Sequence, residues 1–172
     1  EERGKSIYSV LANSVKFKNV WDIGAYKGEY AQIINAITGA NVHLFEPVKY
    51  DELSKFKNVH HVYLYKGVEN RKFYRINNTG DSLYKENTMY YDGIDGEMIT
   101  TTTLDIVENE HKLDIPELIK LDTQGSELDI LLGYSNIEKV QFIQLETTAT
   151  PNYNVGAPKF AEVINFMDLN GF

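Results

Sequence analysis

The residues best suited to chemistry lie in the segment 22–28, which reads DIGAYKG and directly follows an apolar run. An apolar strand that leads into a glycine turn and then a helix brings backbone N–H groups close to a ligand in parallel α/β sheets. Gly24 and Gly28 lack the Cβ that would block such an approach. We therefore predict a nucleotide-type cofactor site at this turn, with Ala25 and Tyr26 beside it.

A second apolar run, 42–45, ends at Glu46 and Pro47. A carboxylate at the carboxyl end of a strand can accept hydrogen bonds from both hydroxyls of a ribose. The carboxyl ends of parallel strands meet at one edge of a sheet, so Glu46 is expected to lie beside the glycine turn. We assign Glu46 and Pro47 to the cofactor site.

The spacing of the turn distinguishes between cofactors. The dinucleotide fingerprint G-x-G-x-x-G needs three glycines, and alignment on Gly24 puts Asp22 in the first position and Lys27 in the third. A carboxylate at Asp22 would repel a pyrophosphate but would suit the cationic amino group of a methionine moiety. This pattern favours S-adenosylmethionine, with a purely structural Asp22 that caps the turn as the alternative.

Three further motifs make this interpretation more specific: KLDTQGSE at 120–127, TTLD at 102–105 and FIQLE at 142–146. In residues, order and spacing they resemble the FkbM family of S-adenosylmethionine-dependent methyltransferases, over about residues 20–172. The resemblance implies a class I methyltransferase fold, S-adenosylmethionine as cofactor and, usually, O-methylation. It leaves the acceptor open, because family members act on different hydroxyl compounds.

Hydrophobic patterning predicts an α/β fold with a Rossmann-like, doubly wound, mostly parallel sheet. Strands are expected near residue 20, near residue 42, and at 59–65, 118–122 and 140–146, in the order 3-2-1-4-5. A lead-in helix is expected within 1–19, further helices at 125–132 and from Pro158, and a β-hairpin insertion at 70–103. The polar loop 77–96 within this insertion reads either as a lid over the cofactor or as a mobile surface loop.

The chain 1–172 is expected to form a single domain, with both ends truncated. It does not begin with Met, and it stops at Phe172, where a seven-stranded methyltransferase fold would continue into its last two strands.

Three more residues are assigned to the cofactor site. Gly67 and Val68 follow the expected third strand and would lie by the adenine. The resemblance implies a role for Ser82, because the family counterpart sits in a similar short Gly/Ser turn, where a hydroxyl could bond the methionine carboxylate.

Asp122 and Glu146 end the expected fourth and fifth strands, at the edge where open α/β sheets bind ligands. Transfer of a methyl group to an alcohol requires removal of the hydroxyl proton, and Asp122 is the preferred general base. Its alternative role is structural, since a carboxylate before a helix stabilises free N–H groups. Glu146 could act as base or bind the acceptor. No His, Asp and Glu set has recognisable metal spacing, so no metal is expected.

Composition bounds the partners. The chain has 17 basic and 25 acidic residues, a net charge of −8, and no cysteine. A polyanion such as nucleic acid would be repelled, and no apolar run reaches the roughly 20 residues of a membrane span. We expect a soluble, cytoplasmic protein acting on a small-molecule or carbohydrate hydroxyl, while the sequence indicates no oligomeric state.

Two other function classes stay open. One is a non-catalytic S-adenosylmethionine-binding module. The other is an NAD-linked sugar-modifying enzyme, which the glycine count disfavours. The Tyr-x-x-x-Lys pair of short-chain enzymes is also missing, because no tyrosine has a lysine four residues further on.

Overall fold

The computed structural model describes residues 2–172, with side chains from residue 7 onward. Its centre is a five-stranded sheet of β1 (Asn19–Ile23), β2 (Asn41–Phe45), β3 (Val59–His60), β6 (Leu118–Leu121) and β7 (Phe142–Leu145). The strand order is β3-β2-β1-β6-β7, and every neighbouring pair is parallel. The predicted order is confirmed, because the two hairpin strands take the numbers in between.

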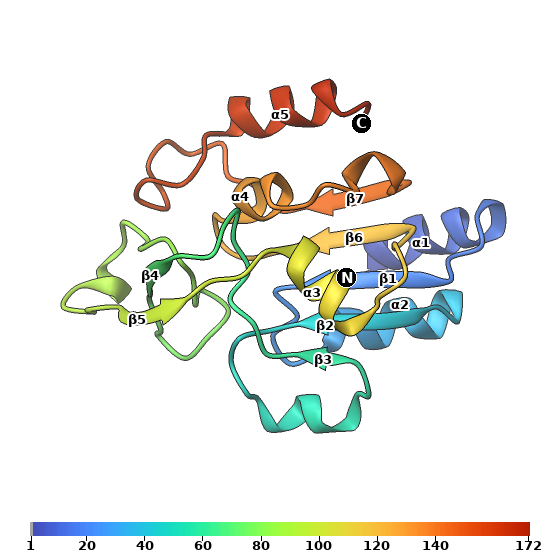
Figure 1. Ribbon diagram of the computed structural model, residues 1–172, viewed down its shortest axis with the longest axis horizontal. Coiled ribbons are helices and arrows are strands. Elements are labelled where there is room, and N and C mark those ends of the chain that lie inside the picture. Colours follow the sequence, from blue (N-terminus) through green and yellow to red (C-terminus); the bar gives the residue numbers. More distant parts are fainter. Residues whose placement is uncertain (1) are drawn as a thin grey trace.

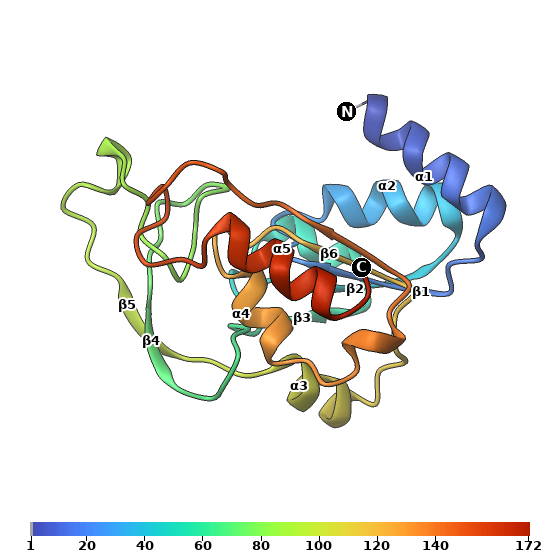
Figure 2. The same ribbon diagram turned by 90° about the horizontal axis from the view of Figure 1, so that it is seen from above.

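Helices cover both faces of the sheet, as Figure 2 shows along its edge. On one face lie α1 (Glu2–Ser14) and α2 (Glu29–Thr38), and on the other lie α3 (Leu104–His111) and α4 (Glu127–Leu132). The last helix, α5 (Phe160–Leu169), lies beyond the edge strand β7 in Figure 1. Short 3-10 turns η1 (Asp51–Lys55), η2 (Met89–Tyr91) and η3 (Ile137–Lys139) complete the regular structure.

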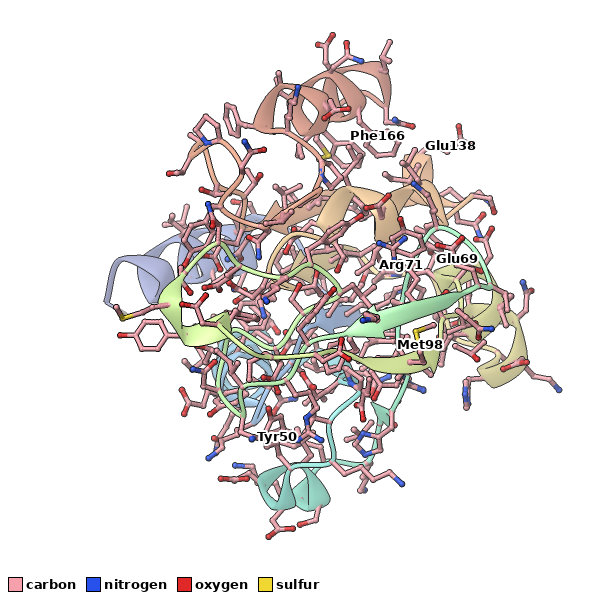
Figure 3. The ribbon with its side chains drawn as sticks, turned by 90° about the vertical axis from the view of Figure 1, so that its left-hand side faces the viewer. Tyr50, Glu69, Arg71, Met98, Glu138 and Phe166 are labelled. Carbon is pink, nitrogen blue, oxygen red and sulfur yellow. The ribbon has the colours of Figure 1, made fainter. Side chains whose placement is uncertain are left out.

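The alternation of side chains along the central strands divides the core in two. Trp21 and Ile119 pack on the face of α3 and α4, where Phe166 of α5, labelled in Figure 3, also contributes. Val20 and Leu118 pack on the face of α1 and α2. This two-sided burial explains why these strands read as continuous apolar runs. The same alternation determines the face of the sheet toward which a polar side chain in these strands points.

The predicted hairpin insertion is present as β4 (Asn70–Phe73) and β5 (Glu97–Thr100), which pair antiparallel. It projects beyond the carboxyl ends of the parallel strands (Figure 1). Figure 3 looks onto it and shows Arg71 beside Glu69, with 3.1 Å between the charged groups. The long loop of the insertion has its own core residue, Tyr91, which is fully buried and donates a hydrogen bond to the Gly80 carbonyl.

The predicted third strand is wrong at its end, because β3 stops at His60 rather than at residue 65. The backbone at Tyr63 and Tyr65 bonds with Thr102, which lies just after β5. The amide of Thr102 donates to the Tyr63 carbonyl at 2.9 Å, and the amide of Tyr65 donates to the Thr102 carbonyl at 2.8 Å. Residues 63–65 therefore bond with the residue that follows β5, and they do not extend β3.

Two helices begin later than predicted. α4 starts at Glu127 rather than residue 125, because Gln124 and Gly125 have φ angles of 57° and 113°, which lie outside the helical region. α5 starts at Phe160 rather than Pro158, and the Glu162 carboxylate accepts a hydrogen bond from the Lys159 amide at 2.7 Å. Such a bond, from the amide of the residue before the helix to the side chain of its third residue, is half of a capping box.

None of the helices described between residues 2 and 172 is both long and apolar enough to cross a membrane.

Candidate functional site

A cavity of about 400 Å³ lies at the carboxyl ends of the parallel strands. Its walls come from the ends of β1, β2 and β6, the segments 62–64 and 78–83, and Glu146. Of the residues predicted for the site, the structure brings seven to this cavity: Gly24, Tyr26, Glu46, Pro47, Ser82, Asp122 and Glu146. Residues far apart in the chain thus meet at the edge of the sheet that the sequence indicated.

The glycine turn serves packing within the protein. Gly24 has a φ of 73°, and a Cβ there would lie 1.9 Å from the carbonyl oxygen of Asp122. Gly28 has a φ of 80°, and its Cβ would lie 2.4 Å from the Phe56 ring. Ala25 and Gly28 do not belong to the described cavity wall. Each glycine therefore makes room for another part of the chain, and close approach of a ligand stays a prediction for Gly24, which alone of the two lies in the cavity wall.

Glu46 is a buried acidic residue of the cavity wall, with 7 % of its surface exposed. It accepts a hydrogen bond from the Tyr26 amide and another from the Val48 amide, both at 2.9 Å. Burial raises the pKa of Glu46 to about 7, although both amide bonds act in the opposite direction. A carboxylate has about four acceptor positions, so the two amides leave positions free for hydroxyl donors.

Asp22 does not reach the cavity. Strand alternation turns its side chain toward α2, where it is fully buried and lies 3.1 Å from the ammonium of Lys120. Burial raises the pKa of Asp22, while Lys120 opposes the shift. The structure therefore provides a partner for Asp22 within the protein, in place of the expected amino group of a methionine moiety.

Lys120 connects this buried acid with the cavity. Besides Asp22, its ammonium donates a hydrogen bond to the Gly24 carbonyl at 3.0 Å and lies 3.5 Å from the Asp122 carboxylate. It also sits over the ring of Tyr30, 5.5 Å from the centroid. One buried cation therefore contacts the glycine turn and the end of β6 together.

Asp122 and Glu146 form a hydrogen-bonded pair of acids at the ends of β6 and β7. The side-chain amide of Gln124 donates to Asp122 at 2.8 Å and lies 3.4 Å from Glu146. Gln124 itself has a left-handed backbone conformation, which is uncommon outside glycine and often occurs at functional sites. The amide thus bridges the two carboxyl groups.

Their surroundings shift the pKa values of the two acids in opposite directions. The hydrogen bond with Asp122, together with burial and repulsion from the same group, raises the pKa of Glu146 to about 7. Burial acts to raise the pKa of Asp122 as well, but the hydrogen bond with Glu146 and the ammonium of Lys120 lower it overall. Near neutral pH the pair therefore holds Asp122 ionised and Glu146 poised to gain or lose a proton.

Three predicted cofactor residues have other surroundings than expected. Ser82 lines the cavity, but its hydroxyl already donates to the Gln124 carbonyl at 2.8 Å, which fixes the insertion to the turn after β6. Gly67 and Val68 do not belong to the described wall, and Val68 is 62 % exposed. They lie away from the cavity because the chain leaves the sheet after His60.

Sequence reasoning missed part of the cavity wall. Tyr50 contributes a ring that meets Tyr26 edge-on at 4.8 Å between centroids, and Figure 3 shows it beside η1. Tyr63 and Gln124 also line the cavity. A signal existed for Gln124, since it lies inside the quoted motif 120–127, whereas nothing in the sequence distinguishes Tyr50 from the other tyrosines.

Three of the four histidines form a cluster, and none of the three lies in the described cavity wall. His43 Nδ1 lies 3.1 Å from His60 Nε2, and the ring of His111 meets that of His60 edge-on at 4.7 Å between centroids. Among the residues that the structure describes, no group of three or more His, Cys, Asp or Glu side chains has an arrangement that could hold a metal ion. We therefore interpret these three imidazoles as side chains that pack together rather than as metal ligands.

A parallel, doubly wound sheet with a cavity and a buried carboxylate at its carboxyl ends is the architecture of a nucleotide-type cofactor-binding domain. Residues 22–172 match the family model described as the methyltransferase FkbM domain, so the chain belongs to the FkbM methyltransferase family. No curated protein and no solved structure matches the chain.

Proposed function

We propose that the chain is an S-adenosylmethionine-dependent methyltransferase that methylates a hydroxyl group of a small-molecule or carbohydrate acceptor. The observation that carries this proposal is that one cavity wall contains both the buried carboxylate of Glu46 and the acid pair Asp122 and Glu146. The first suits a ribose and the second suits an alcohol proton, which are the two recognition tasks of an O-methyltransferase.

The cavity wall fits a nucleoside with a methionine moiety. Apolar and aromatic side chains offer flat surfaces for a base: Phe45, Tyr50, Val62, Tyr63, Leu64 and Phe73. Glu46 retains free acceptor positions for ribose hydroxyls. Asn78, Thr79 and Gln124 supply amide and hydroxyl groups for the polar end of the ligand. A volume of about 400 Å³ also lies within the usual range of cofactor pockets.

When bound, S-adenosylmethionine supplies a methyl group that is already activated on a sulfonium. The chain then has to orient the acceptor hydroxyl and take up its proton. Glu146 is the better matched base, because its pKa of about 7 lies near working pH. Asp122 is held as an anion beside Lys120 and fixes the carboxyl group of Glu146. We therefore assign proton acceptance to Glu146 and its orientation to Asp122, whereas the sequence favoured Asp122 as the base and left Glu146 as base or acceptor ligand.

Calorimetric titration of one sample with S-adenosylmethionine and with NAD tests the cofactor. We expect binding of the first only, and preferential binding of NAD would overturn the proposal in favour of the NAD-linked sugar-modifying enzyme. Transfer of tritium from labelled S-adenosylmethionine to a panel of sugars and polyols tests the reaction. Cofactor binding without transfer to any hydroxyl compound would favour the non-catalytic binding module.

A further inference from the structure

A second hollow, a groove of about 550 Å³, lies beside the cofactor cavity. Its walls are the start of α4, the segment 147–158 and the start of α5. The groove and the cavity share two wall residues, Gln124 and Glu146. The acid that we assign as proton acceptor is therefore exposed to both hollows, and a molecule in the groove can present a group to the cofactor cavity past Glu146.

The charges of the groove disfavour an anionic ligand. Its walls include three acids, Glu127, Glu146 and Glu162, against one base, Lys159. Two of the acids are engaged by the backbone: Glu127 accepts the Thr123 amide at 2.7 Å, and Glu162 accepts the Lys159 amide. These carboxylates stay fixed at the wall, so a phosphate or carboxylate on a ligand would meet like charge.

The remaining wall combines hydroxyl groups with apolar surface. The segment after β7 contributes threonine and tyrosine hydroxyls, while a proline and a phenylalanine provide apolar faces: Thr147, Thr148, Thr150, Tyr153, Pro151 and Phe160. Hydroxyl groups both donate and accept hydrogen bonds, and ring faces pack against the apolar faces of sugars and other polyols. The wall chemistry therefore suits an uncharged molecule with several hydroxyl groups.

The groove wall is held in place by the hairpin insertion. The amide of Asn87 donates to the Tyr153 carbonyl at 2.7 Å, and the amide of Val155 donates to the Lys85 carbonyl at 2.8 Å. The Tyr153 hydroxyl donates to the Glu86 carboxylate at 3.3 Å. These bonds join segments that lie far apart in the chain, so the groove is built before any ligand binds.

The other side of this wall packs against the turn that carries Gln124. A Cβ on Gly125 would lie 3.1 Å from the Cβ atoms of both Asn154 and Ala157. The wall segment and the turn beside the acid pair thus form one packed unit. A ligand bound against this wall segment therefore lies next to the turn that carries Gln124.

We propose that this groove binds the methyl acceptor, and that it selects an uncharged, polyhydroxylated molecule with an apolar face, such as a neutral glycoside. This inference rests on the proposed function, because it needs Glu146 to stand between acceptor and cofactor. It adds that the insertion determines acceptor choice, since residues 85–87 hold the groove wall.

The test is amide-detected NMR on the full chain saturated with S-adenosylhomocysteine. Two probes differ in charge at one position: 4-nitrophenyl β-D-glucopyranoside, which is neutral, and 4-nitrophenyl β-D-glucuronide, which carries a carboxylate. We expect the glucoside to shift amide signals within 147–155, and the glucuronide to bind at least about tenfold more weakly.

A matched pair of variants tests the location. Thr148→Trp fills the groove and should weaken glucoside binding at least about tenfold. Thr100→Trp, on the exposed surface of β5 and outside both hollows, should leave it unchanged. Calorimetry with S-adenosylhomocysteine should give the same affinity for both variants and the parent, which excludes loss of folding as the cause.

Absence of glucoside shifts, shifts confined to another region, or equal binding of the glucuronide would overturn the groove proposal while cofactor binding leaves the proposed function intact. Failure of S-adenosylhomocysteine itself to bind would overturn the proposed function, and the groove proposal would fall with it.

Discussion

Replacement of Asp122 by asparagine should lower the pKa of Glu146. The hydrogen bond with Asp122 is the largest reason why the pKa of Glu146 rises from its usual 4.5 to about 7, and charge repulsion from Asp122 adds to it. Asparagine keeps the shape of the side chain and removes its charge. Because Glu146 is exposed, water screens part of this interaction, and we expect a fall of about 1 to 2 pKa units rather than full reversal.

The pKa can be measured without an acceptor. Protein labelled with ¹³C in the glutamate carboxyl groups is titrated between about pH 4 and about pH 9, since carboxyl shifts report ionisation directly. Glu146→Gln identifies the signal of Glu146. Asp92→Asn provides the control, because it makes the same chemical change at an exposed position outside both hollows. The parent and this control should titrate alike at Glu146.

Two results would refute the reasoning. If the pKa of Glu146 in Asp122→Asn stayed within about 0.3 units of the parent, the two acids would not be coupled as described. If the parent value itself lay near 4.5, Glu146 would be an ordinary surface acid.

The same shift determines the pH dependence of methyl transfer. Glu146 accepts a proton only when ionised, so the activity of the parent should increase as the pH rises through about 7. In Asp122→Asn this rise should move to lower pH, following the lower pKa of Glu146. In Glu146→Gln, turnover should fall by about 10²- to 10⁴-fold.

Three further outcomes are expected. Glu46→Gln should weaken binding of S-adenosylmethionine by about 10- to 100-fold in calorimetry, because a charge-assisted bond contributes about 1.5 to 3 kcal/mol; an unchanged affinity would contradict the ribose assignment. Gly24→Ala should lower the free energy of unfolding in urea by about 3 kcal/mol or more, because backbone strain and the clash with the Asp122 carbonyl add. Gly39 has a φ of 69° but open space around it, so Gly39→Ala should cost only about 1 to 2 kcal/mol. Burial and the neighbouring imidazoles lower the pKa of His60 from 6.5 to about 4, so the folded state binds its proton less readily than the unfolded state. The free energy of unfolding should therefore be full above about pH 6.5 and fall by about 1 to 3 kcal/mol toward pH 4. His60→Phe should reduce this loss.

The sequence predicts the strand order because local patterns determine it. Apolar runs near residues 20, 42, 118 and 140, with a helix or long crossover between them, leave few topologies that obey right-handed connection rules. The edge at which the ligand cavity forms follows from the same rules, which is why the positions of Glu46 and Asp122 in the sequence are enough to place both in one site.

The parts that failed depend on contacts between distant segments. The end of the third strand depends on bonds between Tyr63, Tyr65 and Thr102, and no local pattern announces that pairing. The assignment of Asp22 to the ligand fails because the face of the sheet on which the cavity opens cannot be read from β1 alone. The groove wall depends on the bonds that join 85–87 to 153–155, which a pattern confined to one segment does not contain.

Lys120 contacts both the glycine turn after β1 and the acid pair at the ends of β6 and β7. A buried ion pair contributes little to stability, because the desolvation of both charges offsets their attraction. Its position, however, affects the charges at the cavity, because the ammonium donates to the Gly24 carbonyl in the glycine turn and lies near Asp122 in the acid pair. One side chain therefore contacts both the glycine turn and the acid pair. Asp22 pairs with that side chain from the α2 face of the sheet, so the cation beside Asp122 has its main partner outside the cavity.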